Sequence, residues 1–400
     1  MRDLTASQRK IIGSERHIWP NELAFAEAIY AERLELIQQD ILARGLSVVI
    51  LFDPENMYWL TGYQTIGYFT FQAMCIPASG KPVIVTRVVN RDMALALPTI
   101  GDAISVFDTQ DHVDILEAFL KNTVPTGQIG IDTTSRYLSI CDYTRFVDRL
   151  GGRFKPFINV IEAHRMVKTL CELERMRAAA SAVKAGIDAA LKTIAVGKTD
   201  NDLAAALYQG SIAAGSEYIG HPPMVVTGPR SELCFALWKR NTIEKGDVVL
   251  LEGAGCVDRY HAMMSRSAVV GKATDEHKAT ADALVEILET AIDTIKPGVT
   301  AGEVDFACRQ KVEKRGLGQY FKSRTAYGIG IGFPPNWAEG HIYSLRPNDP
   351  MVLQPNMTFH VIPTMFRTGF GMAISDSVRV TEDGCEVLTN YPRDLMEIDA

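Results

Sequence analysis

The spacing of apolar residues in the first part of the chain alternates between helix-like and strand-like patterns. Residues 22–43 place apolar side chains at helical spacing, and Gly45 follows as a stop signal. Short apolar runs, with a turn at Gly80, predict strands at 47–54, 69–77, 81–86, 104–108 and 128–132, and a helix is expected near 111–122. This alternation predicts an α/β domain over residues 22–160, preceded by an N-terminal extension of residues 1–21.

The second part of the chain contains an internal repeat. Residues 166–196 contain no proline and many Ala, Glu and Arg residues, which predicts a long helix. The segment TIAVGKT at 193–199 then returns as TIKPGVT at 294–300, an offset of 101 residues. In each copy a helix is expected to end at the Gly and the next helix to begin after the Thr. Strand-like runs follow the two helix pairs, at 248–255, 261–271, 328–333, 357–366 and 372–381.

Two helix pairs that each lead into strands favour a duplicated unit. Two unrelated helix pairs that happen to share a turn are the alternative. The duplication predicts an α+β domain over residues 161–400, with an internal pseudo-twofold repeat and helices that cover one face of the sheet.

The composition is that of an ordinary globular chain. Apolar residues make up 47% and charged residues 22% of the sequence, and the net charge is −7. No run of Lys and Arg is longer than two residues, which argues against general binding to nucleic acid or to an anionic membrane. The seven cysteines form no C-x-x-C pair, so neither a disulfide framework nor a zinc knuckle is predicted. No window has the apolar length of a signal peptide or a membrane span, and we expect a soluble cytoplasmic protein.

Five short segments of the second half resemble, in their order and spacing, the creatinase/prolidase family. They are residues 244–247 (EKGD), 265–267 (SRS), 328–332 (GIGIG), 362–363 (IP) and 374–376 (ISD). The resemblance covers about residues 22–390. It implies a creatinase-like N-terminal α/β domain and a C-terminal catalytic domain with the pita-bread fold.

The positions that bind metal in this family are changed in this sequence. Metal-dependent members hold two divalent ions with two Asp, one His and two Glu, and hard cations require such ligands. The resemblance places Glu252, Met263, Ile329, Ile362 and Ser375 at those five positions. No Asp, Glu or His lies within one residue of Met263 or Ile329, so a shifted alignment does not restore the ligands. We therefore expect neither a metal nor any other cofactor.

The metal-free members of the family offer a closer comparison. The positions of the creatine-hydrolysing His and Glu are Phe235 and Ser265 here, so that machinery is absent. Residues 61–65 (TGYQT), residues 67–72 (GYFTFQ) and the loop 328–337 resemble the branch that opens the cyclic amidine ring of ectoine.

This resemblance implies a hydrolase that converts ectoine, or hydroxyectoine, to N-acetyl-L-2,4-diaminobutyrate in compatible-solute catabolism. A separate deacetylase would act on the product. The alternatives are another metal-free amidine or C–N hydrolase with a different small substrate, and a non-catalytic binding protein that kept the pocket.

Opening an amidinium ring with water requires a base or nucleophile, an anionic partner for the N–H groups and a proton donor. Glu252 lies in an apolar strand, where a carboxylate is costly without a cationic partner, and the following glycines at 253 and 255 permit a close approach. We interpret Glu252 as the nucleophile or base. Direct attack and activation of water both remain open. The alternative is a core ion pair with Arg266 or Arg259.

Two further residues are candidate catalytic groups. Asp376 follows the changed ligand position Ser375 and can pair with a ring N–H of the substrate. The alternative is that it caps a turn or pairs with Arg379. His360 alternates with Ile362 toward the same side of a strand and is a candidate proton shuttle, the alternative being a packed core histidine.

The loop at residues 333–341 (FPPNWAEGH) is the main candidate for substrate binding. Trp337 can cover the face of a cation, Glu339 can accept an N–H, and Tyr327 lies just before the loop. His221, in the segment GHPP, is a further candidate, the alternative being an ordinary turn histidine. A plain proline turn with a hydrophobic plug is the alternative for the loop.

The substrate carboxylate requires a cation, for which Arg324 and Arg230 are both available. In creatinase relatives the N-terminal domain of one subunit lends an aromatic loop to the pocket of the other. Aligned through residues 61–63, that aromatic residue is Tyr68, which can instead form a buried hairpin edge. The resemblance thus implies a homodimer whose N-terminal loop acts in trans.

Overall fold

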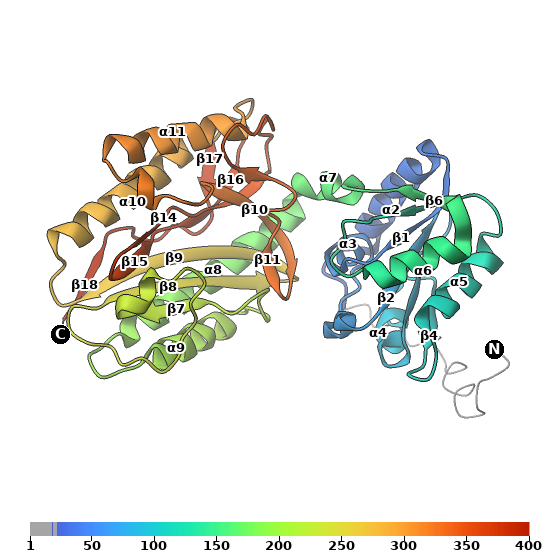
Figure 1. The fold of residues 1–400 in the computed structure, drawn as a ribbon, viewed down its shortest axis with the longest axis horizontal. Coiled ribbons are helices and arrows are strands. Elements are labelled where there is room, and N and C mark those ends of the chain that lie inside the picture. The colour runs from blue at the N-terminus through green and yellow to red at the C-terminus, as the bar shows by residue number, and fades with distance from the viewer. Residues whose placement is uncertain (1–17, 19–21, 400) are drawn as a thin grey trace. The chain divides into compact units, whose positions relative to one another are not determined.

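The structure is a computed structural model that describes residue 18 and residues 22–399. The predicted N-terminal extension, residues 1–21, lies outside the described residues except for Ile18. The chain divides into two compact units, with the division between His164 and Arg165. Each unit has its own sheet (Figure 1).

The first unit is an α/β domain. Its elements are α2 (Glu27–Ala43), β1 (Leu46–Leu51), α3 (Pro54–Thr61), η2 (Ile66–Phe69), β2 (Gln72–Pro77), β3 (Val83–Arg87), η3 (Val88–Asn90), α4 (Arg91–Leu95), β4 (Asp102–Val106), α5 (His112–Thr123), β5 (Gln128–Ile131), α6 (Ile140–Leu150), η4 (Gly151–Arg153) and β6 (Phe154–Pro156). The sheet order is β4-β3-β2-β1-β5-β6, and β2 is antiparallel to both of its neighbours. Leu116 of α5 and Phe146 of α6 pack on Val48 and Ile50 of β1, so these two helices cover one face of the sheet.

The second unit contains two helix pairs and a large sheet. After α7 (Val160–Met166), which spans the division, its elements are α8 (Leu170–Thr193), α9 (Asp200–Ala213), β7 (Met224–Thr227), η5 (Gly228–Glu232), β8 (Val248–Val257), β9 (Tyr260–Val270), α10 (Asp275–Thr294), α11 (Ala301–Lys314), η6 (Gly318–Tyr320), β10 (Ala326–Phe333), β11 (Asn336–Ala338), β12 (Ser344–Leu345), β13 (Thr358–Val361), β14 (Thr364–Arg367), β15 (Phe370–Ala373), β16 (Asp376–Val380), β17 (Cys385–Val387) and β18 (Met396–Ile398). The main path of the sheet is β17-β16-β13-β10-β9-β8-β7.

The two helix pairs confirm the predicted repeat. Helices α9 and α11 begin and end at positions related by the offset of 101 residues. Thr199 and Thr300 precede them and form capping boxes, in which each Thr side chain accepts from the backbone N–H three residues later. Gly197 and Gly298 adopt φ angles of 84° and 85°, so the same left-handed turn separates the helices in both copies. The fold is therefore the predicted duplicated α+β unit behind an α/β domain.

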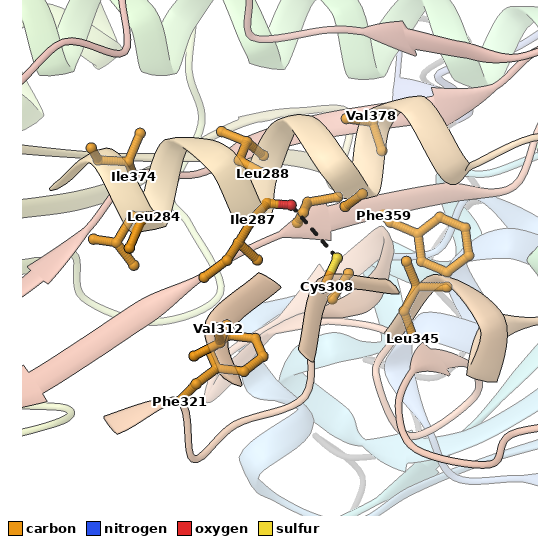
Figure 2. Packing of buried hydrophobic residues seen from close by; sticks show 14 of the residues in the cluster. Leu284, Ile287, Leu288, Cys308, Val312, Phe321, Leu345, Phe359, Ile374 and Val378 are labelled. Carbon is orange, nitrogen blue, oxygen red and sulfur yellow. Dashed lines mark hydrogen bonds between the residues drawn. The ribbon is translucent and has the colours of Figure 1, made fainter. Parts of the chain in front are cut away.

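The helix pairs build two separate cores on the sheet (Figure 1). The pair α8 and α9 packs on β7, β8 and β9, whereas α10 and α11 pack on strands of the second half. Figure 2 shows Leu284 and Leu288 of α10 above Val312 of α11, with Phe359 of β13 and Val378 of β16 lining the same core. Among the described residues, no helix combines the length and apolar character that crossing a membrane requires.

Candidate active site

The candidate active site is a cavity of about 250 Å³ in the second unit, hereafter the Glu252 cavity. It lies at strands β7, β8, β10 and β11 and at the segment that follows β7. Its lining residues are His221, Met224, Val226, Ser231, Leu233, Cys234, Phe235, Ala236, Leu250, Glu252, Ser323, Arg324, Tyr327, Asn336, Trp337, Ala338, Ile362, Thr364, Phe366 and Ala373.

Strand alternation directs Glu252 into this cavity. Successive side chains of a strand point to opposite faces, and Leu251 packs in the core under α8 and α9 while Leu250 and Glu252 line the cavity. Gly253 and Gly255 lie against the helices that cover the sheet. A Cβ at Gly253 would lie 3.2 Å from the Leu207 side chain, and one at Gly255 would collide with the carbonyl of a residue in α8. The close approach predicted at these glycines is therefore that of helix packing, not of a substrate.

The Glu252 carboxyl group is buried and has no counter-ion among the described residues. Only 3% of the residue is exposed. Within residues 22–399, no side chain donates a hydrogen bond to it or forms an ion pair with it. Arg259 instead donates to the carbonyls of Gly332 and Tyr218. Burial alone raises the pKa of Glu252 to about 8. Without a cationic ligand in the cavity, the protonated form of Glu252 is therefore favoured at neutral pH.

Three aromatic side chains in contact with one another, His221, Trp337 and Tyr327, line the cavity together with Glu252. The ring centroids of His221 and Trp337 are 3.4 Å apart, and the indole Nε1 of Trp337 donates to the Tyr327 hydroxyl at 3.2 Å. His221 is held in place because Nδ1 donates to the Pro222 carbonyl at 2.8 Å, and burial lowers its pKa, so the ring is neutral. Three of the predicted substrate-binding residues thus line one cavity.

His360 lies outside the cavity lining and contacts the Tyr327 hydroxyl. Its Nδ1 is 2.7 Å from the Tyr327 hydroxyl, and its Nε2 is 2.7 Å from Oγ of Ser375. The ring is fully buried, and burial together with the charge of Arg266 lowers its pKa to about 3. His360 is therefore neutral at ordinary pH and reaches the cavity only through Tyr327.

The structure places two of the predicted site residues, Asp376 and Glu339, outside the lining of the Glu252 cavity. The Asp376 carboxylate pairs with Arg266 and Arg393, at 3.1 and 2.8 Å, and is fully buried away from the cavity lining. The Glu339 carboxylate accepts from Arg165 and Lys168, at 2.6 Å each, and lies outside the lining as well. These ion pairs occupy both carboxylates, so their positions favour structural roles over contact with substrate.

Tyr68 lies in the first unit. It is buried, with 8% of its surface exposed, and its ring meets Tyr137 edge-on at 5.7 Å between centroids. The neighbouring Phe69 is 79% exposed and Ile66 is 67% exposed. In the turn η2 it is therefore Phe69, and not Tyr68, whose aromatic side chain is exposed.

Sequence reasoning missed the segment between η5 and β8. Leu233, Cys234, Phe235 and Ala236 line the Glu252 cavity, and Phe235 is 75% exposed with a φ of 63°. No motif marks this stretch, although Phe235 occupies a position that the family comparison had singled out. Of the two candidate arginines, Arg324 lines the cavity and Arg230 does not.

The side chains at the five family metal positions do not fit a two-metal centre. Glu252 and Ile362 line the cavity, Ser375 binds His360, and Met263 and Ile329 are fully buried apolar residues. Across the described part of the chain, no three His, Cys, Asp or Glu side chains are grouped so that they could hold a metal ion. One carboxylate among thioether, hydroxyl and hydrocarbon groups is a poor donor set for a divalent cation.

An α/β domain followed by a duplicated pita-bread unit, with a pocket on the sheet, is the architecture of creatinases and prolidases. The family description "Creatinase/Prolidase N-terminal domain" matches residues 33–167, and "Metallopeptidase family M24" matches residues 174–382. The chain belongs to this family.

One of the relatives with a named activity matches nearly the whole chain. The "Ectoine hydrolase" of Halomonas elongata is 29% identical over 394 residues, which cover 93% of this chain and 98% of the relative. Among solved structures, the prolidase of Thermococcus sibiricus has a TM-score of 0.83 at 23% identity and covers 92% of this chain and 99% of its own. The dipeptidase PepE of Mycobacterium ulcerans has a TM-score of 0.80 at 24% identity and covers 94% of this chain and 100% of its own. The solved structures establish the shared fold.

Proposed function

We propose that this protein is a metal-independent hydrolase that opens the cyclic amidine ring of ectoine, or of hydroxyectoine, to N-acetyl-L-2,4-diaminobutyrate. The observation that carries the proposal is the buried Glu252 carboxyl group, which faces a cavity and lacks a counter-ion among the residues described. An unpaired buried carboxylate is costly, and a cationic ligand removes that cost. The relative named ectoine hydrolase supports a substrate of this charge.

Two residues of the cavity lining, Glu252 and Trp337, can act on a bound amidinium ring. Ionised Glu252 pairs with the amidinium charge and either attacks the carbon between the two nitrogens or activates water for that attack. Trp337 can cover the face of the cation, which contributes roughly 0.5–2 kcal/mol. No step needs a metal, because the positive charge of the amidinium already makes its carbon electrophilic.

Arg324 is the cation proposed to bind the substrate carboxylate. It lines the cavity and its guanidinium carbon lies 5.2 Å from the centroid of the Tyr327 ring. We expect Arg324→Gln to raise KM by about ten- to a hundredfold with a smaller effect on kcat, because a lost charge-assisted hydrogen bond is worth roughly 1.5–3 kcal/mol. Steady-state kinetics on ectoine measure both constants. Arg230→Gln is the matched variant, and a larger rise in KM there would reverse the assignment.

Turnover by the purified protein tests the function itself. We expect metal-stripped protein incubated with ectoine to release N-acetyl-diaminobutyrate, detected by NMR or mass spectrometry, in the presence of a chelator. Turnover that appears only after Mn²⁺ or Fe²⁺ is added would overturn the metal-free mechanism. Tight binding without turnover would instead identify a binding protein, and turnover of a different cyclic amidine would reassign the substrate.

The oligomeric state and the reaction that uses the product are also part of the proposed function. We propose a cytoplasmic homodimer in which the turn η2 of one subunit, through the exposed Phe69, contributes to the cavity of the other. The acetylated product is a substrate for a deacetylase, which would complete the catabolic sequence.

A further inference from the structure

The hydroxyl of Tyr327 is fixed from two sides. Trp337 Nε1 lies 3.2 Å from its oxygen, and His360 Nδ1 lies 2.7 Å from it. On the far side of the imidazole, Nε2 lies 2.7 Å from Oγ of Ser375. These contacts link a cavity residue on β10 to residues on β11 and β13 and to the segment before β16.

Ser375 determines which nitrogen of His360 carries the proton. Oγ of Ser375 already accepts a hydrogen bond from the backbone N–H of Ser265 at 2.7 Å. Its own hydrogen requires an acceptor, and Nε2 of His360 is the one that the described residues provide. Because the ring is neutral, an accepting Nε2 leaves the proton on Nδ1, which donates to Tyr327.

Tyr327 is consequently restricted to donating. Its oxygen accepts from Trp337 and from His360, which uses both lone pairs. Its hydroxyl hydrogen has no acceptor in the part of the chain that the structure describes, and the side chain lines the cavity together with Glu252. Burial and the nearby Glu252 raise the pKa of Tyr327 well above its usual value, so its hydroxyl keeps the proton in the empty site. The two N–H donors reduce the cost of the negative charge that forms on the phenol oxygen when the proton leaves.

The amidinium nitrogens of the bound substrate offer no hydrogen-bond acceptor to the Tyr327 hydroxyl. Both nitrogens carry N–H groups, and their lone pairs are delocalised over the central carbon. When an oxygen adds to that carbon, the nitrogens become tetrahedral and regain a lone pair that can accept. An interaction with Tyr327 therefore forms only as the reaction proceeds, which raises kcat and not the affinity for substrate.

We propose that Tyr327 is the proton donor to the leaving ring nitrogen, and that His360, Trp337 and Ser375 are positioning residues that hold its hydroxyl as a donor. This assignment rests on the proposed ring-opening function. It moves Tyr327 from substrate binding to catalysis and gives His360 an indirect role in the transfer.

The protons and electrons balance on this chain's own groups. Glu252 takes a proton from water, the water oxygen bonds to the amidine carbon, and the C=N π pair moves to nitrogen. Tyr327 gives its proton to that nitrogen, and the C–N bond breaks with its electron pair on nitrogen. The hydroxyl proton of the collapsing intermediate restores Tyr327 as the amide carbonyl forms. The proton held by Glu252 passes to the released amine.

The decisive variant is Tyr327→Phe. We expect its kcat on ectoine to fall about a hundredfold, while KM and the dissociation constant change by less than about threefold, since general-acid groups contribute roughly 10²–10⁴-fold. Tyr391→Phe, which removes a hydroxyl bound to Asp188 outside the cavity, is the matched control and should leave both constants unchanged. A kcat within threefold of wild type, or a rise in KM alone, would overturn the assignment.

Two substitutions of His360 test the positioning role. His360→Asn places an amide N–H near the position of Nδ1, whereas His360→Gln places it near Nε2. We expect the Asn variant to keep about tenfold more of kcat than the Gln variant at unchanged KM, and the reverse order would overturn the tautomer. Ser375→Ala, which removes the hydroxyl that fixes the tautomer, provides the same readout if either variant fails to fold. Failure of wild-type protein to open the ring would instead count against the proposed function.

Discussion

Glu252→Gln is expected to reduce turnover of ectoine by at least about a thousandfold while the protein still binds the substrate. The amide keeps the shape of the side chain but can neither attack the amidine carbon nor take a proton from water. The described residues that line the cavity include no second Asp or Glu, so no other carboxylate of the lining can replace it. Single-turnover kinetics and calorimetric titration with ectoine measure the two effects separately. A near-normal rate would show that Glu252 is neither nucleophile nor base.

The same variant has a second consequence for stability. Burial raises the pKa of Glu252 from 4.5 to about 8, so the folded protein holds this proton more tightly than the unfolded chain does. Stability of the empty wild-type protein therefore falls as the pH rises from about 4.5 through 8, and the Gln variant lacks that loss. We expect Glu252→Gln to become more stable than wild type at pH 9, by several kcal/mol at most, since one pKa unit corresponds to about 1.4 kcal/mol.

A surface carboxylate provides the control for this pH effect. Glu397 bonds to Lys272, which lowers its pKa, so its contribution to stability is present at neutral pH and is lost in acid. Glu397→Gln should accordingly lose stability relative to wild type as the pH rises through the acid range up to about 4.5, and should run parallel to wild type above it. Thermal unfolding between pH 3 and 9 covers this range and the range from about 4.5 to 8 in which Glu252 acts. If the stability of Glu252→Gln followed the same pH dependence as that of Glu397→Gln, the result would contradict the unpaired state of Glu252.

The parts of the fold that the sequence predicted are those set by local chemistry. The turns at Gly197 and Gly298 and the caps at Thr199 and Thr300 depend on a few adjacent residues, so the repeat was visible without coordinates. Glu252 stood out for the same reason, because a lone carboxylate in an apolar strand is conspicuous. The structure was needed to locate the pocket, to show that the carboxyl group is desolvated, and to show that no described residue is its counter-ion.

The site residues that the sequence predicted less accurately are those whose ion-pair partners lie far away in the chain. Asp376 and Glu339 looked available for a substrate, but each meets cations from distant segments, Arg266 in one case and Arg165 and Lys168 in the other. Similarly, the strand predicted over 357–366 divides into β13 and β14 around a proline, and the buried helix α3 has no amphipathic pattern to reveal it. Spacing along the chain carries no information about such long-range pairs.

Glu339→Gln is expected to cause the largest loss of stability. The carboxylate lies between Arg165 and Lys168, and all three side chains are at most 2% exposed. Burial alone would lower the pKa of Lys168, but Glu339 raises it above its usual value, so the ammonium group stays charged inside the protein. Removing the carboxylate leaves two buried cations, which costs roughly 3–5 kcal/mol. Denaturant unfolding measures this loss.

Because Glu339 lies outside the cavity lining, we expect the folded fraction of Glu339→Gln to bind ectoine with unchanged affinity. Glu386→Gln is the matched control. Glu386 pairs with Arg177 at 2.8 Å and with Arg379 at 3.0 Å, but its own side chain is 32% exposed, so each pair contributes about 1 kcal/mol or less. A stable Glu339→Gln protein with a KM raised tenfold would instead assign Glu339 to the substrate. That result would mean that its two cations rearrange when the substrate binds, since both carboxylate oxygens are already occupied in the empty site.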